Sequence, residues 1–151
     1  ATAIRAGMTV CVLQQLELAY APPFGSAKDP VNMAGFVGDN ILKGLVNSVT
    51  YDRAAEMENA LFVDVRTRKE FEAGNIPDSV NIPREELRER IGELPKDRDL
   101  VVLCRSGVRS YAACRVLRQT GFDLLSNLSG GYISYCHYTG KIEPPEVKAG
   151  A

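Results

Sequence analysis

The chain has no excess of basic residues and no long apolar run. Its 151 residues carry 18 Lys and Arg against 19 Asp and Glu, so the net charge of −1 gives no support for nucleic-acid binding. No apolar stretch approaches the ~20 residues that a membrane-spanning helix needs. The first residues lack the charged start and apolar core of a signal peptide. We therefore expect a globular cytoplasmic protein with no membrane or nucleic-acid partner.

Cysteine and histidine are also scarce. Neither a C-x-x-C pair nor a metal-ligand spacing connects Cys11, Cys104, Cys114 and Cys136 with the single histidine, His137. The sequence therefore predicts no zinc site and no disulfide framework. The dinucleotide-binding pattern G-x-G-x-x-G is absent as well, so this chain by itself is expected to hold no cofactor.

What the sequence does contain is a strand, loop and helix pattern around Cys104. Residues 100–103 form an unbroken apolar run, which is typical of a parallel strand buried on both faces. Beyond the loop, apolar residues recur at a spacing of four in a predicted helix that starts near Ser110 and stops at Gly121. Open α/β sheets bind their ligands at the carboxyl ends of such strands. Cys104 is therefore the candidate nucleophile.

The residues after Cys104 favour a thiolate and a bound anion. Backbone amides and the positive end of a helix stabilise a thiolate over a thiol. Arg105 and Arg109 add two cations with no acidic residue between them. The alternative is a buried structural cysteine, because free cysteine is among the most buried residue types. Two arginines and a glycine in the loop argue against that alternative.

This stretch resembles the active loop of the rhodanese family of sulfurtransferases, in which six residues opened by the catalytic cysteine cradle a persulfide. The resemblance implies that Cys104 is catalytic and that the substrate is held by Arg105, Ser106, Gly107, Val108, Arg109 and Ser110. Cys-based phosphatases instead use the pattern C-x5-R, which would need an arginine in place of Ser110. The shorter loop suits a single sulfur atom better than a tetrahedral phosphate.

Two further segments match the rhodanese pattern. Asp64 and Arg66 follow another apolar run, and Glu70 lies in the helix predicted after them. The resemblance implies that they support the site, and that Arg66 and Glu70 are more readily paired with each other than with substrate. Thr67 and Glu70 also have the spacing of a capping box.

The start of the chain resembles a different class of protein. Residues 18–35 are similar to the end of the dimerisation domain in flavin-dependent pyridine nucleotide-disulfide oxidoreductases of the coenzyme A-disulfide reductase and NADH oxidase group, some of which carry a rhodanese domain after it. The resemblance, with a start at Ala1 rather than Met, implies a longer homodimeric parent that uses FAD, NAD(P)H and coenzyme A. In that family the tyrosine matching Tyr20 reaches the redox site of the partner subunit. A helix-end aromatic is the simpler interpretation of Tyr20 here.

Together these patterns predict an α/β fold with a rhodanese-like, mainly parallel sheet of four or five strands, covered by helices on both faces, and an N-terminal helical arm. We expect a helical remnant at 1–45, a sulfurtransferase domain at 46–143 and a disordered tail at 144–151. In the arm, helices are predicted over 8–20 and 32–45, with too little sequence for a core. Gly130 and Gly131 match the closing rhodanese motif and would let the backbone pass close to the loop.

The implied chemistry is a double displacement. Cys104 would take the outer sulfur of a donor as a persulfide and pass it to a thiol or another nucleophile. Arg105 and Arg109 would bind an anionic donor such as thiosulfate, polysulfide or a thiol persulfide. The alternative is a docking or regulatory module with little activity of its own.

Overall fold

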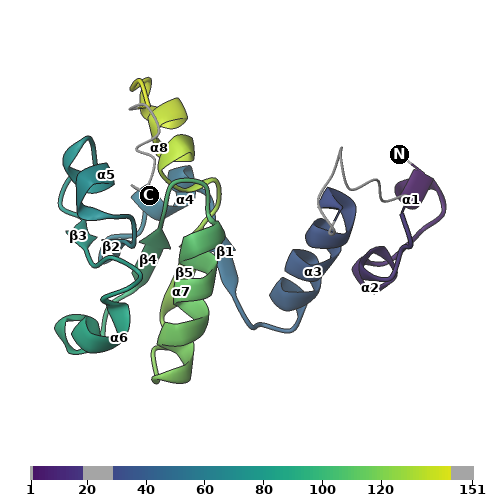
Figure 1. Ribbon diagram of the computed structural model, residues 1–151, viewed down its shortest axis with the longest axis horizontal. Helices are drawn as coiled ribbons and strands as arrows, with labels where there is room; N and C mark the ends of the chain where they lie inside the picture. Colours follow the sequence, from purple (N-terminus) through teal and green to yellow (C-terminus); the bar gives the residue numbers. More distant parts are fainter. Residues whose placement is uncertain (1, 19–28, 144–151) are drawn as a thin grey trace. The chain divides into compact units, whose positions relative to one another are not determined.

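The computed structural model describes residues 2–18 and 29–143, which form two units (Figure 1). One unit lies within residues 1–45 and the other begins at residue 46. Tyr20 and the predicted tail at 144–151 lie outside the described residues.

The described part of the first unit holds the helices α1 (Thr2–Arg5), α2 (Val10–Gln14) and α3 (Pro30–Leu42). α2 and α3 pack closely, since a Cβ on Gly35 would lie 2.7 Å from the backbone nitrogen of Gln14. The helix predicted over 8–20 is wrong in length. The Asn32 Nδ2 donates to the carbonyl oxygens of Leu13 and Leu16, both at 3.0 Å, and so binds carbonyls that a longer helix would have used itself.

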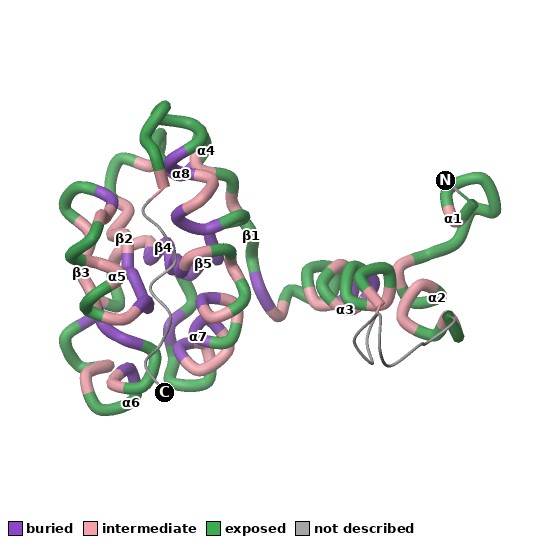
Figure 2. Tube along the Cα trace, turned by 45° about the horizontal axis from the view of Figure 1, so that its top comes forward, coloured by how far each residue is buried: buried purple, intermediate pink, exposed green. Residues whose placement is uncertain are grey.

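The apolar side chains of this first unit are not buried within its described residues (Figure 2). Among the described residues of this unit, the buried ones are Gly35 and Asp39 of α3. The longest described helix, α3, has 13 residues, and none of the described helices is long and apolar enough to cross a bilayer.

The second unit alternates strands with helices. Its elements are β1 (Asn47–Val49), α4 (Tyr51–Ala55), β2 (Leu61–Asp64), α5 (Arg68–Glu72), β3 (Val80–Asn81), α6 (Leu87–Arg90), the 3-10 helix η1 (Ile91–Glu93), β4 (Leu100–Leu103), α7 (Val108–Gln119), β5 (Leu125–Leu128) and α8 (Gly131–Thr139). The five strands pair in parallel in the order β1-β5-β4-β2-β3. This arrangement confirms the predicted α/β fold and parallel sheet.

Both faces of the sheet are covered, as predicted. Side chains alternate along β4, the middle strand. Leu100 and Val102 join a core cluster with residues of α6 and α7, such as Leu87 and Leu117. Val101 and its neighbours on the other face join a second cluster with residues of α4 and α8. Figure 2 shows this central strand buried between the layers.

The topology places two connections side by side. β2 and β4 are adjacent and parallel, so their carboxyl ends lie at the same edge of the sheet. From that edge the chain continues into α5 after β2 and into α7 after β4. Strand order reverses between them, because β3 pairs on the outer side of β2 and β5 on the outer side of β4. Such a reversal is where open α/β sheets bind their ligands.

Candidate active site

Cys104 lies directly after β4, beneath the loop that leads to α7. Cys104 is only 1% exposed to solvent. The amide of Gly107 donates to its Sγ at 3.1 Å. α7 starts at Val108, two residues before Ser110, near which its start was predicted, and Gly107 is its N-cap at φ 110°. The helix N-terminus is therefore closer to the sulfur than the sequence indicated, because a glycine can adopt the left-handed turn that starts the helix directly.

Hydrogen bonds control the charge state of Cys104. Burial raises the pKa of its thiol, but the Ser110 hydroxyl and the amides of Ser110, Gly107 and Ser106 outweigh burial, so the pKa lies below its usual value. The Ser110 Oγ is 3.5 Å from Sγ and 3.1 Å from the Gly107 carbonyl oxygen. Ser106 and Val108 are exposed, and Ser106 acts on the sulfur through its backbone amide. The loop thus favours a thiolate.

Ser110→Ala should raise the pH midpoint for alkylation of Cys104, because it removes the hydroxyl that stabilises the thiolate. In the unaltered chain, the iodoacetamide rate should reach half its maximum below the ordinary thiol pKa of about 8.5. Equal midpoints for the two proteins would show that the backbone amides suffice.

The other cysteines lie in different surroundings. Cys114 is buried inside α7, and burial raises the pKa of its thiol to about 12. This thiol therefore stays protonated at neutral pH. Cys136 is buried in α8, and Cys11 is exposed in α2.

Both loop arginines pair with carboxylates. Arg109 donates from Nη1 and Nη2 to the two oxygens of Glu70, at 2.8 and 2.6 Å. The Arg105 Nε lies 2.8 Å from Oε1 of Glu143. The sequence pattern indicated only a structural role for Glu70 and no role for Glu143. The adjacency of β2 and β4 could have pointed to Glu70, because it places the start of α5 beside the Cys104 loop.

Glu70 joins α5 to the loop. The predicted capping box is present: the Glu70 amide donates to the Thr67 hydroxyl at 3.3 Å, and the Thr67 amide donates to Glu70 Oε2 at 3.0 Å. The Thr67 hydroxyl adds a bond of 2.9 Å to the same oxygen. With Arg109 as the main cause, these partners lower the pKa of Glu70 from 4.5 to about 2.

The Glu70 ion pair should make stability depend on pH. A carboxylate with a lowered pKa in the folded state stabilises the fold above its unfolded pKa, and this stabilisation is lost as pH falls towards the folded pKa. At about 1.4 kcal/mol for each pKa unit, a pKa of about 2 against 4.5 gives roughly 2–3 kcal/mol for this partly exposed pair.

The free energy of unfolding of Glu70→Gln should therefore fall below that of the unaltered chain above about pH 5, and the gap should close towards about pH 2. Urea titrations across this range measure the gap. A gap that does not vary with pH would show that the ion pair has no such effect.

Asp64 and Arg66 form a separate, fully buried pair. Arg66 donates from Nε to both Asp64 oxygens, at 3.0 and 2.9 Å, and from Nη2 to Oδ2 at 2.6 Å. Nη2 also reaches the Gly74 carbonyl oxygen at 2.8 Å, and the guanidinium lies 4.0 Å from the centroid of the Tyr132 ring. The predicted pairing of Arg66 with Glu70 is thus wrong. Residues two apart at a strand end face the same side, so Asp64 meets Arg66 and leaves Glu70 to Arg109.

Gly131 brings the start of α8 against the loop, as predicted. A Cβ on this residue would lie 2.3 Å from the Cys104 carbonyl oxygen and 2.7 Å from that of Arg105. The Tyr132 and Ile133 amides donate to the same two oxygens, at 2.8 and 3.1 Å. These bonds fix the two peptide groups that follow Cys104.

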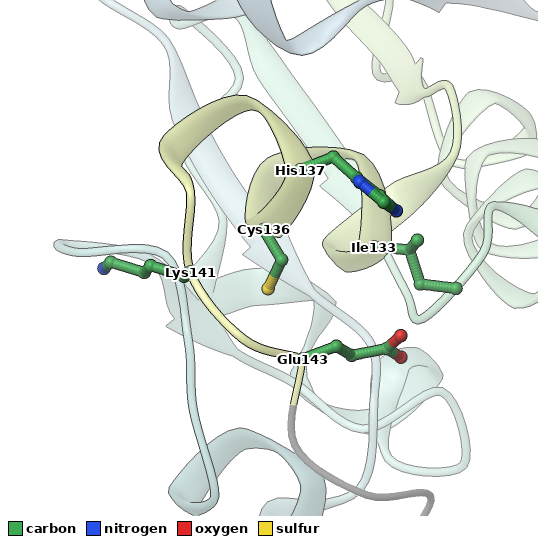
Figure 3. A pocket seen from close by; sticks show the side chains of 5 residues that line it. All are labelled: Ile133, Cys136, His137, Lys141 and Glu143. Atoms are coloured by element: carbon green, nitrogen blue, oxygen red, sulfur yellow. The ribbon is translucent and has the colours of Figure 1, made fainter.

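A cavity of about 110 Å³ lies beside α8 (Figure 3). Its lining consists of Ile133, Cys136, His137, Lys141 and Glu143. Figure 3 shows the Cys136 thiol pointing between α8 and the segment after it, whereas Lys141 points the other way. Cofactor pockets usually measure about 300–1,000 Å³, so this cavity does not fit a flavin. Within the described ranges, no group of three or more His, Cys, Asp or Glu residues could hold a metal ion.

Comparison with known proteins gives consistent matches. Residues 49–137 match the rhodanese-like domain family. A sulfurtransferase of Allochromatium vinosum is 45% identical over 94 residues, which make up 62% of this chain and 88% of that protein. Two solved structures resemble 89% of the chain: reduced CoADR-RHD of Bacillus anthracis, with 44% identity and a TM-score of 0.82, and a NAD-dependent persulfide reductase from A. fulgidus, with 39% identity and a TM-score of 0.77.

The coverage of these relatives differs. The chain spans most of the Allochromatium sulfurtransferase but only 24% of each of the two solved proteins. What those two whole proteins do is therefore not by itself a property of this chain.

Proposed function

The chain belongs to the rhodanese-like domain family, and on that premise we propose that it is a sulfurtransferase domain in which Cys104 carries sulfur as a persulfide. The observation that carries this proposal is the set of donors around Sγ, with the Gly107 amide at 3.1 Å and the Ser110 hydroxyl at 3.5 Å. Donors in this arrangement stabilise the attacking thiolate. They also offer hydrogen bonds to a second sulfur with negative charge.

The reaction has two displacement steps. The Cys104 thiolate attacks the outer sulfur of thiosulfate, an S–S bond forms, the donor S–S bond breaks and sulfite leaves with the electron pair. With a protonated thiol persulfide as donor, the leaving group is the thiolate of that thiol. An acceptor nucleophile then takes the outer sulfur and regenerates the Cys104 thiolate.

The donor is proposed to be thiosulfate, polysulfide or a thiol persulfide. Arg109 supports this choice because its guanidinium interacts with the Cys104 sulfur: the pKa of Arg109 is raised mainly by Glu70 and, to a smaller extent, by Cys104. A donor with an exposed terminal sulfur is favoured, since Cys104 is buried.

In a longer parent, this domain would exchange sulfur with a flavin-dependent reductase acting on coenzyme A disulfides, persulfides or polysulfides. The resemblance of residues 18–35 and the likeness to the persulfide reductase support that proposal. FAD, NAD(P)H and coenzyme A would then act in the parent, which is proposed to be a homodimer.

Steady-state kinetics with thiosulfate or polysulfide as donor and cyanide as acceptor test the proposal. A persulfide intermediate predicts parallel lines in double-reciprocal plots, because the first product leaves before the acceptor binds. Absence of transfer from every donor class would favour the docking or regulatory alternative. Lines that intersect would contradict an enzyme-bound intermediate.

A further inference from the structure

We propose that Glu70 and Glu143 determine donor specificity by neutralising the two loop arginines, so that the Cys104 site disfavours doubly charged donors and accepts thiol persulfides. This inference rests on the proposed function and narrows its substrate class. Neither carboxylate belongs to the loop, so the specificity of the site depends on α5 and on the segment that follows α8.

The Glu70 contacts hold Arg109 rigidly. Both carboxylate oxygens bind the guanidinium in a two-pronged pair, which fixes its orientation as well as its charge. The Glu70 side chain is only 12% exposed, against 32% for Arg109. Because the capping box also holds Glu70 in place, an anionic ligand must compete with a preorganised carboxylate for this arginine.

Glu143 acts in the same way on Arg105. Its Oε1 lies 2.8 Å from the Arg105 Nε, and the side chains of Glu143 and Arg105 are 27% and 35% exposed. The Ile133 amide bonds the Arg105 carbonyl oxygen and so ties α8 to the loop. Figure 3 shows the Glu143 carboxylate on the same side as Ile133 and His137. Glu143 is therefore the weaker and more exposed of the two partners.

The charges explain the expected preference. Two guanidinium groups and two carboxylates cancel, which leaves the Cys104 thiolate as the uncompensated charge among these five groups. A thiosulfate dianion approaches this site against repulsion, whereas a protonated thiol persulfide does not. Two uncompensated arginines would reverse the preference.

The test compares Glu70→Gln with the unaltered chain. Glutamine keeps the helix-capping geometry and an acceptor for Arg109 but removes the charge. The measured quantity is the ratio of kcat/KM for thiosulfate to kcat/KM for the persulfide of 2-mercaptoethanol. This ratio cancels changes in the folded fraction and in the reactivity of Cys104. It should rise about fivefold, the order expected for one partly screened charge near the reacting sulfur.

Two further variants calibrate this result. Glu143→Gln should raise the ratio by about twofold, because its ion pair is more exposed and better screened. Glu86→Gln is the matched control, since Glu86 is likewise a carboxylate paired with arginine, but its partners Arg68 and Arg90 lie in α5 and α6 and not in the Cys104 loop. Its ratio should equal that of the unaltered chain.

Sulfate gives a second measurement that needs no sulfur transfer. Sulfate should protect Cys104 from iodoacetamide at a severalfold lower concentration in Glu70→Gln than in the unaltered chain. A ratio and a protection constant that both stay unchanged in Glu70→Gln would overturn the specificity inference alone. If neither donor places sulfur on Cys104 of the unaltered chain, the proposed function fails and the inference fails with it.

Discussion

Cys104→Ser should lower sulfur transfer by at least about a thousandfold, because a serine hydroxyl stays protonated at neutral pH and cannot hold a sulfane sulfur. The loop should remain folded, since a serine oxygen can accept the Gly107 amide that bonds the sulfur, and the contacts of Gly131 and the Tyr132 and Ile133 amides reach backbone oxygens. The measurement is the rate of thiocyanate formation from thiosulfate and cyanide, or the equivalent rate with a persulfide donor.

Cys114→Ala and Cys136→Ala are the matched controls for this substitution. Both thiols are buried, so alanine avoids placing a hydroxyl in the core. The high pKa of Cys114 keeps it protonated, and Cys136 faces the cavity beside α8. Each variant should retain activity within about threefold of the unaltered chain. Loss of activity in Cys136→Ala comparable to that in Cys104→Ser would indicate a two-cysteine mechanism.

Gly131→Ala should be the most damaging single-methyl substitution at the site. The new Cβ would meet the Cys104 and Arg105 carbonyl oxygens at 2.3 and 2.7 Å, and the residue has φ 56°, which alanine adopts with difficulty. The backbone of the loop or of α8 must move. We expect a loss of roughly 3 kcal/mol or more in the free energy of unfolding. Transfer activity should fall with it, because the peptide next to Cys104 is displaced.

Gly140→Ala distinguishes the backbone strain of a positive φ from the steric clash of a new Cβ with the loop. Gly140 has φ 69°, similar to that of Gly131, but a Cβ there meets nothing within 4 Å. This variant should lose only about 1–2 kcal/mol and keep its activity. Urea unfolding curves of the two variants give the comparison. Equal losses would mean that left-handed strain, and not the contact with the loop, accounts for the role of Gly131.

The parallel sheet and the position of Cys104 could be predicted because their signals are local. An apolar run followed by a cysteine and a glycine is enough to indicate a buried strand and a loop before a helix. The capping box of Thr67 and Glu70 is equally local, and it is present. The close approach at Gly131 followed from the glycine pair in the closing rhodanese motif.

The pairing of the charges could not be predicted in the same way. Glu70 and Arg109 are 39 residues apart, and Arg105 and Glu143 are almost as far apart, so each pair depends on how the elements meet in space. The sequence showed two arginines without acidic neighbours and therefore indicated free cations. In the fold, the carboxylates come from other elements. The early end of α2 could not be predicted for the same reason, because it depends on Asn32 of another helix, α3, which binds the last carbonyls of α2.

The most direct test of the account is the mass of the Cys104 peptide after incubation with thiosulfate or polysulfide. We expect the mass of this peptide to increase by one sulfur atom, which cyanide removes and which is not gained by Cys104→Ser. The peptides with Cys114 and Cys136 should keep their mass, because the Cys114 thiol is protonated and both thiols are buried. A sulfur adduct on another cysteine, with Cys104 unmodified, would contradict the assignment of Cys104 as the sulfur carrier.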